Sequence, residues 1–203
     1  GKTTFCNLIP RFYEANEGSV TIDGKDIRSL TLESLRKNIG IVQQDVYMFF
    51  GTIADNILYG KPDAAAEDIM EAAKLANAHD FITKLENGYD TFVGERGVKL
   101  SGGQKQRLAI ARAIVKKPEI YIFDDSFSAL DYATDLKLRA RLHKEITDAT
   151  MLIVAQRIGT IRYADKIIVL NEGEMVAEGT HGELLASSSI YHDIAASQLS
   201  EEE

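Results

Sequence analysis

Short apolar runs alternate with helical segments along most of this sequence, and this alternation constrains the fold more than any other feature. The apolar runs cover residues 39–42, 120–123, 150–154 and 166–170. The helical segments cover residues 3–12, 32–38, 101–115 and 135–146. Such alternation is typical of α/β domains, in which a helix connects each strand to the next parallel strand. We therefore predict an α/β fold with a mostly parallel sheet.

Shorter elements are expected near the two ends of the chain. They are a strand at 18–24 that turns at residues 23–24, a hairpin around residues 172–173, and two closing helices near 182–186 and 191–198.

A long helical stretch interrupts the alternation. From residue 52 to about residue 85, apolar side chains recur at spacings of three and four residues, which places them on one face of a helix. We expect no strand from residue 52 to residue 100, so the stretch indicates a helical insertion. The expected division of the chain is an α/β core of residues 1–50 and 117–203, and a helical subdomain of about residues 51–116.

The composition excludes several classes of protein. The 203 residues include 23 Lys and Arg against 31 Asp and Glu, a net charge of −8, whereas nucleic-acid-binding proteins need a basic face to neutralise phosphates. A single cysteine, Cys6, rules out an internal disulfide framework and fits a reducing compartment. The longest apolar runs are much shorter than the roughly 18 residues that a bilayer-spanning helix requires. We expect a folded domain that does not bind nucleic acid.

The first four residues, Gly1-Lys2-Thr3-Thr4, match the end of the phosphate-binding loop G-x-x-x-x-G-K-[ST]. In such a loop a glycine lets backbone amides approach phosphate oxygens, the lysine reaches the β- and γ-phosphates, and a hydroxyl binds magnesium. The chain starts without a methionine, so we expect that an amino-terminal part precedes these residues. A tetrapeptide is weak evidence alone, and the start of an ordinary helix is the alternative.

Two carboxylates, Asp124 and Asp125, follow the apolar run at 120–123. The end of a buried strand is where phosphoryl-transfer proteins place the carboxylate that holds the magnesium of a bound nucleotide. A strand that ends in an ordinary polar loop is the alternative. The combination with Lys2 favours nucleotide binding.

A third motif, Ser101-Gly102-Gly103-Gln104, opens the helix predicted at 101–115. Two glycines and a serine expose backbone amides and a hydroxyl near the positive end of the helix dipole, where a γ-phosphate can bind. With these motifs in this order, the chain resembles the nucleotide-binding domain of ABC transporters over nearly its whole length.

The resemblance implies a P-loop NTPase (RecA-like) core with the inserted helical subdomain of ABC proteins, and it implies ATP and Mg²⁺ as ligands. It assigns the Walker A end to Gly1, Lys2, Thr3 and Thr4, the Q-loop to Gln44, the signature to Ser101, Gly102, Gly103 and Gln104, the Walker B carboxylate to Asp124, and the end of the D-loop to Asp131. It implies Thr3, Gln44 and Asp124 as the residues around magnesium. Residues 91–97 resemble the segment that exporter-type members place against the coupling helices of their membrane domains.

Two positions depart from the pattern of the family. Asp125 stands where the family usually has a glutamate that polarises the attacking water, and a carboxylate drawn back by about 1 Å can lose on the order of a hundredfold in rate. Gln156 stands where the family has its switch histidine, and an amide cannot carry a proton or a positive charge near neutral pH. With Gln44, these residues are the candidate catalytic groups.

The paired departures resemble the degenerate half of heterodimeric, multidrug-type ABC exporters. The resemblance then implies a slow hydrolytic site in this chain and an intact signature that completes the site of a different partner subunit. It also implies membrane domains in the same transporter, and a location on the cytoplasmic face of the plasma membrane.

Three other interpretations remain open. In a homodimeric transporter Asp125 would still serve as the catalytic base. A non-transport ABC ATPase acting on DNA or ribosomes is less favoured, because the chain is acidic and no heptad run lies between the Walker A end and the signature. A binding or structural module without nucleotide function is the third.

Overall fold

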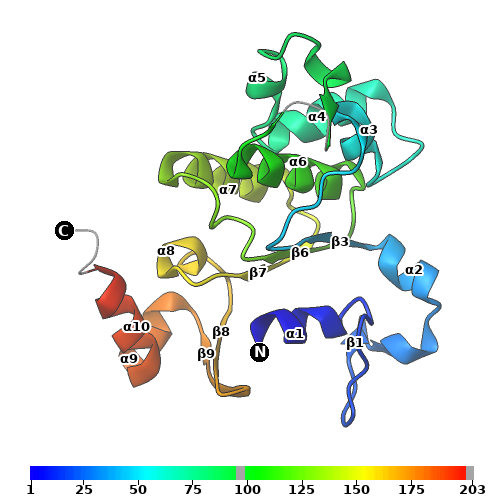
Figure 1. The fold of residues 1–203 in the computed structure, drawn as a ribbon. Helices are drawn as coiled ribbons and strands as arrows, with labels where there is room; N and C mark the ends of the chain where they lie inside the picture. The colour runs from blue at the N-terminus through cyan, green and yellow to red at the C-terminus, as the bar shows by residue number, and fades with distance from the viewer. Residues whose placement is uncertain (95–98, 200–203) are drawn as a thin grey trace.

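A three-stranded parallel sheet lies at the centre of the computed structural model, which describes residues 1–94 and 99–199 (Figure 1). Its strands, in spatial order, are β3 (Ile39–Val42), β6 (Ile120–Asp124) and β7 (Thr150–Val154). The register pairs Val42 with Phe123 on one side of β6 and Asp124 with Val154 on the other. The α/β fold with a parallel sheet is therefore confirmed.

Helices cover both faces of this sheet (Figure 1). They are α6 (Gly102–Val115) and α7 (Tyr132–Glu145) on one face and α1 (Lys2–Leu8) on the other. Successive side chains of a strand point to opposite faces, so β6 contributes side chains to the cores on both faces of the sheet. Tyr121 and Phe123 belong to the large core with α6 and α7, whereas Ile122 packs with Cys6 of α1 in a second core.

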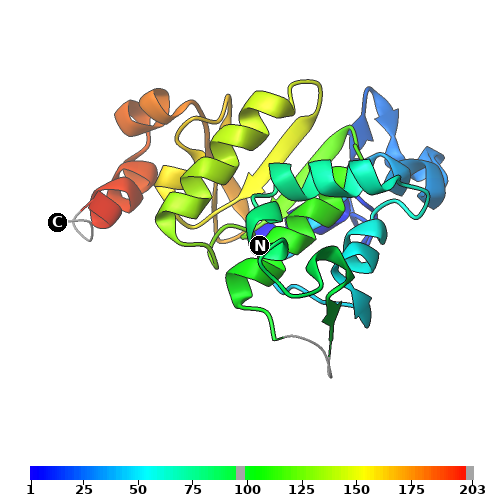
Figure 2. The same ribbon diagram turned by 90° about the horizontal axis from the view of Figure 1, so that it is seen from above.

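The helical insertion consists of three helices in place of the continuous pattern that the periodicity suggests. They are α3 (Ile53–Leu58), α4 (Ala66–Leu75) and α5 (His79–Ile82), and they pack around α6 (Figure 2). The chain turns after α3 at Gly60, where a Cβ atom would lie 1.9 Å from the carbonyl oxygen of Arg112. Only glycine allows this close approach between the end of α3 and α6.

The prediction that residues 52–100 contain no strand is wrong. After η2 (Gly88–Asp90), β5 (Phe92–Val93) pairs antiparallel with β4 (Gly51–Thr52). The carbonyl of Thr91 also accepts the amide of Ile53 over 3.0 Å. A two-residue pairing between segments far apart in the sequence leaves no periodic signal, because alternation needs at least four residues to be visible.

Two helices on the core differ from their predicted bounds. α1 ends at Leu8 because Pro10 cannot donate a backbone hydrogen bond and Arg11 has a φ of 54°. α7 begins at Tyr132, three residues earlier than expected. Asp131 is its N-cap and accepts the amide of Thr134 over 2.9 Å, so the cap and not the first apolar residue sets the start.

The remaining elements lie at the two ends of the chain. Near the amino terminus they are β1 (Thr21–Ile22), β2 (Lys25–Asp26), η1 (Ile27–Ser29) and α2 (Leu32–Lys37). Near the carboxyl terminus they are α8 (Ile158–Ile161), β8 (Ile167–Asn171), β9 (Glu174–Gly179), α9 (His181–Ser187) and α10 (Ser189–Leu199). The predicted turns at 23–24 and 172–173 are confirmed by the antiparallel pairs β1–β2 and β8–β9.

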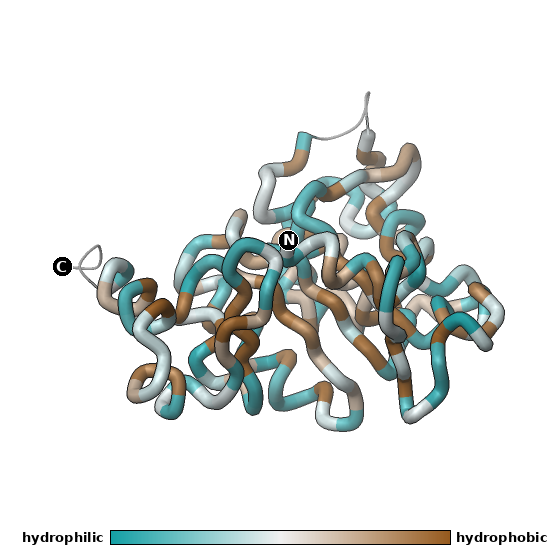
Figure 3. Tube along the Cα trace, turned by 90° about the horizontal axis from the view of Figure 1, so that it is seen from below, coloured by the Kyte–Doolittle hydropathy of each residue, from teal (hydrophilic) through white to brown (hydrophobic). Residues whose placement is uncertain are grey.

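Apolar segments concentrate in the strands of the sheet, and hydrophilic segments lie in the connecting loops (Figure 3). Within the part of the chain that the structure describes, no helix has the length and apolar character needed to cross a membrane.

The contact at Gly60 generates a test of the fold. We expect Gly60→Ala to lower the free energy of unfolding by about 3 kcal/mol, because the methyl group must displace the backbone of α6. Urea unfolding measures the change. Gly182→Ala is the matched control, since no atom lies within 4 Å of a Cβ built there; equal stability of the two variants would contradict the packing at Gly60.

Candidate functional site

The carboxyl ends of β3, β6 and β7 meet at one edge of the sheet, and three of the predicted motifs leave the sheet there. Gln44 follows β3, Asp125 follows β6 and Gln156 follows β7. Two hydrogen bonds fix these loops: Ser126 Oγ donates to the carbonyl of Val42 over 2.7 Å, and the Asp125 amide donates to the carbonyl of Val154 over 3.0 Å. Ligand sites of open α/β sheets lie at this edge.

The first helix, α1, packs on β6 with Cys6 near Asp124, and the predicted Walker A residues form its amino-terminal end. Cys6 is buried against the sheet, and burial, with a smaller contribution from the negative charge of Asp124, raises the pKa of its thiol to about 11. The thiol therefore stays protonated at neutral pH. Ahead of it, Gly1, Lys2, Thr3 and Thr4 are all exposed, with Gly1 as the N-cap and Lys2 to Thr4 in the first turn of α1.

Asp124 carries an unsatisfied carboxylate oxygen. The residue is 6 % exposed, and its Oδ1 atom is buried without a hydrogen-bond partner among the described residues. Leaving a buried acceptor without a partner costs about 1–3 kcal/mol, and more when the acceptor is charged. A cation would supply the missing interaction, and magnesium bound to a nucleotide prefers one or two carboxylates together with phosphate oxygens. Asp124 therefore fits the predicted role at the magnesium ion.

Asp125 and Gln156 are brought together. Gln156 Nε2 donates to Asp125 Oδ2 over 3.2 Å. Asp125 has a φ of 49°, in the left-handed region that aspartate tolerates better than most residues. Gln156 is exposed, as is Gln44 in the loop after β3. The two departures from the family pattern thus contact each other at the edge that carries Asp124.

The signature motif is built as a helix cap. Ser101 Oγ accepts the amide of Gln104 over 3.2 Å, and Gln104 Oε1 accepts the amide of Ser101 over 2.9 Å. This capping box rigidifies the start of α6. Gly102 is exposed and Gly103 contacts the D-loop, because a Cβ atom there would lie 3.3 Å from the carbonyl oxygen of Ala129.

The D-loop ends at the start of the next helix. Hydrogen bonding by Thr134 lowers the pKa of Asp131, which is the N-cap of α7. Because Gly103 closely approaches Ala129, the signature and the D-loop are neighbours. The signature is not brought to the Walker A end in this chain, since α6 and α1 lie on opposite faces of the sheet (Figure 1).

Exposed aromatic rings gather around the β4–β5 pair and α3 of the helical insertion. Tyr47 is 80 % exposed and Phe50 is 75 % exposed. Phe50 meets Phe92 edge to face at 4.7 Å, and Phe49 stacks on Tyr59 at 4.0 Å. We call these five residues the aromatic surface. The segment predicted at 91–97 adjoins it through Phe92, while its residues 95–97 lie outside the described part of the chain.

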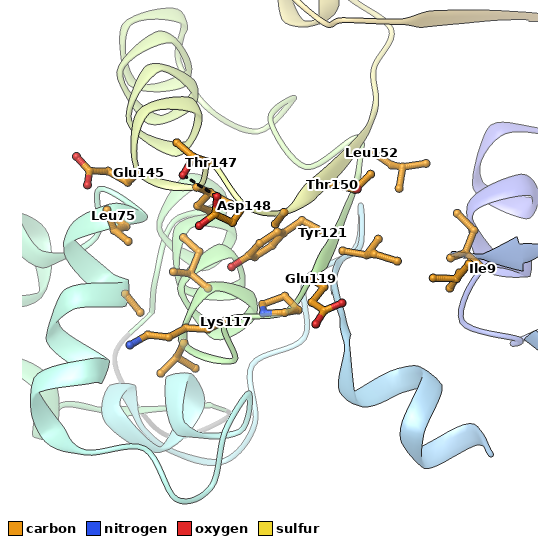
Figure 4. Close-up of a pocket in the computed structure, with 18 of the residues that line it drawn as sticks. Ile9, Leu75, Lys117, Glu119, Tyr121, Glu145, Thr147, Asp148, Thr150 and Leu152 are labelled. Carbon is orange, nitrogen blue, oxygen red and sulfur yellow. Dashed lines mark hydrogen bonds between the residues drawn. The ribbon is translucent and has the colours of Figure 1, made fainter. Parts of the chain in front are cut away.

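A large cavity lies away from all of these motifs. It has a volume of about 1120 Å³ and lies near the amino ends of β6 and β7, where Lys117, Glu119, Tyr121 and Asp148 line it (Figure 4). None of the predicted site residues lines this cavity. Size alone therefore does not identify the functional site of this chain.

Sequence reasoning missed several residues that hold the site in place. Ser126 joins β6 to β3 as described above, and Gln198 of α10 hydrogen-bonds the loop that carries Gln156. Neither residue stands in a recognisable motif. Asp135 and Arg139 form a largely buried ion pair on α7 at 2.7 Å, and their spacing of four residues is a signal that could have identified them.

Comparison with known proteins agrees with this arrangement. The sequence profile described as ABC transporter matches residues 1–128. Two proteins of Staphylococcus aureus, from strains NCTC 8325 and bovine RF122, are named as multidrug export ATP-binding/permease proteins. Their sequences are 51 % and 50 % identical to this one, over alignments that cover 98 % of this chain. The chain spans about a third of their length, 34 % in each case.

A solved structure, described as a bacterial Atm1-family ABC exporter with ATP bound, superposes with a TM-score of 0.94 at 44 % sequence identity. The match covers 98 % of this chain and 35 % of that one. The chain belongs to the ABC transporter family and has the fold of that family's nucleotide-binding domain.

Proposed function

We propose that this chain is the ATP-binding domain of an ABC exporter, which couples ATP binding and hydrolysis to transport across a membrane. The observation that carries the proposal is the buried Oδ1 of Asp124, unpartnered among the described residues and close to α1, the helix that begins at Lys2. An uncompensated acceptor at the phosphate-binding edge of an α/β sheet is suited to a nucleotide-bound cation. The exporters that the chain resembles support the transport role.

Each motif residue has a role in this proposal. Amides of the Walker A end, with Lys2, bind the phosphates, while Gly1, Thr3 and Thr4 shape the start of α1. Thr3, Gln44 and Asp124 would hold a magnesium ion, which would offset the negative charge of the phosphates during phosphoryl transfer. The α/β core would comprise residues 1–50 and 117–203, and the helical subdomain about residues 51–116.

We further propose that this nucleotide site hydrolyses ATP slowly. A base must reach the attacking water, and Asp125 is one methylene shorter than the glutamate of the family pattern. Its Oδ2 atom also accepts the hydrogen bond from Gln156 Nε2, so this oxygen is already engaged and is less free to accept a proton from the attacking water. Gln156 itself can donate to a γ-phosphate but cannot carry a proton.

The intact signature supports a second role, in a partner subunit. Ser101, Gly102 and the adjoining D-loop residue Asp131 are exposed, and they lie on the face of the sheet opposite to α1. We propose that Ser101 to Gln104 complete the nucleotide site of a second, different ABC nucleotide-binding domain. This chain would then be one half of a heterodimer.

The aromatic surface supports contact with the transmembrane domains of the same transporter. Contiguous exposed apolar groups mark interaction sites on proteins. Phe50 and Phe92 form such a pair, and Tyr47, three residues before Phe50, is exposed as well. Contact with the transmembrane domains would place this domain on the cytoplasmic face of the plasma membrane. We propose ATP and magnesium as its ligands and no nucleic-acid partner.

The first test concerns nucleotide binding by the full-length protein. We expect Lys2→Ala to lower MgATP affinity about tenfold or more, since a charge-assisted contact to phosphate is lost. Asp124→Asn should abolish the stimulation of ATP binding by magnesium. Calorimetric titration measures both. Lys25→Ala, which removes an exposed lysine from β2, should bind normally; unchanged affinity in Lys2→Ala and Asp124→Asn would contradict the proposal.

The second test concerns the slow site. We expect the double variant Asp125→Glu/Gln156→His to raise ATP turnover at this site on the order of a hundredfold, because the longer carboxylate reaches the water. Single-turnover hydrolysis measures the change, and Asp125→Asn should stay as slow as the wild-type chain. Brisk turnover by a complex of identical chains, abolished by Asp125→Asn, would instead support a homodimeric ATPase.

The third test concerns the signature. Ser101→Ala and Thr180→Ala each remove the N-cap of a capping box and should cost about 1 kcal/mol of stability. We expect only Ser101→Ala to reduce steady-state hydrolysis by the heterodimer, while leaving ATP binding at this chain's own Walker A site unchanged. Equal hydrolysis in both variants would contradict the role of the signature in the partner's site.

A further inference from the structure

The carboxyl-terminal helix α10 reaches the loop after β7 through the side chain of Gln198. Its Nε2 atom donates to the carbonyl oxygen of Gln156 over 2.7 Å, and its Oε1 atom accepts the amide of Ile158 over 2.7 Å. A carboxamide donates and accepts at once, which neither a carboxylate nor an ammonium group can do. Gln198 thus binds the backbone on both sides of Arg157.

The helix that carries Gln198 is anchored elsewhere. Tyr191 of α10 is 2 % exposed and packs with Ile167, Val169 and Leu184 in the core between the β8–β9 hairpin and α9. Its hydroxyl is hydrogen-bonded to His181 Nδ1 at 2.8 Å. α10 also packs against α8 (Figure 1). Gln198 therefore extends from a buried support and not from a free helix end.

A second anchor holds the other end of the same loop. Arg139, paired with Asp135 at 2.7 Å, donates from Nη1 to the carbonyl oxygens of Gly159 and Thr160 at 3.0 and 3.2 Å. The backbone from residue 156 to residue 160 is thus fixed from α10 and from α7. The side chain of Gln156 is then directed to Asp125 Oδ2.

We propose that Gln198 is a positioning residue that holds Gln156 at the γ-phosphate end of the nucleotide site. The inference rests on the proposed function of this chain in ATP binding. Because Gln156 is the group we propose to donate to the γ-phosphate, which ADP lacks, Gln198 would support discrimination of ATP from ADP and would not contribute to the binding of ADP.

The test compares nucleotide affinities in the full-length protein. Loss of two hydrogen bonds in Gln198→Ala should weaken MgATP binding about fivefold and leave MgADP binding unchanged. In a Gln156→Ala background the same substitution should have no effect on MgATP. Hydrogen exchange of the Ile158 amide, followed by mass spectrometry, should become about tenfold faster in Gln198→Ala.

Two further variants sharpen the result. Gln198→Glu keeps the acceptor for Ile158 but loses the donor to Gln156, so it should protect the Ile158 amide and still weaken MgATP binding. Asp193→Asn, on the same helix with its side chain 82 % exposed, should behave as the wild-type protein in every measurement.

Equal weakening of ATP and ADP binding by Gln198→Ala would overturn the proposal, since it would indicate general damage to the fold. Unchanged ATP affinity would overturn it as well. A wild-type protein that binds neither nucleotide would overturn the proposed function and with it the role of Gln198. The two failures are distinguishable, because a failure of the positioning role alone leaves wild-type ATP binding intact.

Discussion

The parallel pairing of β6 with β3 on one side and β7 on the other is the interaction on which the rest of the structure depends. Its register ends the three strands together, so that Asp124 at the end of β6 and Gln44 and Gln156 in the loops after β3 and β7 lie at one edge. A slip of β6 by one residue would exchange its two faces. Ile122 would then leave the core beside α1, and Asp124 would no longer lie near Cys6 of that helix. The chemistry of the site is thus a consequence of strand register.

Two local features of this edge oppose stability. Asp124 keeps a buried carboxylate oxygen without a partner among the described residues, and Asp125 has a φ of 49°. Such features persist only where the surrounding packing over-determines them. Phe123 of β6 and Leu138 of α7 are fully buried in the same core, and Ser126 joins the turn to β3. Both unfavourable features lie where we propose that the nucleotide binds, which is where residual strain and unsatisfied charge serve binding.

Two half-buried cations connect the helical subdomain to the sheet. Arg112 of α6 donates to the carbonyls of Tyr47 and Asn56 at 3.1 and 2.8 Å, and burial lowers its pKa to about 10, so it remains charged at neutral pH. Lys116 donates to the carbonyls of Arg36 and Ile39 at 2.6 and 2.7 Å. Through these bonds the aromatic surface, the signature helix and β3 form one connected unit. That connection suits a domain proposed to transmit nucleotide binding to membrane domains.

Periodicity and local chemistry were sufficient to predict the α/β class, the strands of the central sheet and the residues at their ends, because alternation, caps and motifs depend on neighbours in the sequence. The same signals could not predict the β4–β5 pair, the close approach at Gly60 or the two hydrogen bonds between Gln198 and the loop after β7. Each of these joins segments far apart in the chain; Gln198 and Gln156 are separated by 42 residues. Hydrogen bonds and steric contacts of that kind arise only when packing brings the segments together. The sequence therefore determined which groups the site contains, and the tertiary structure decided which of them meet.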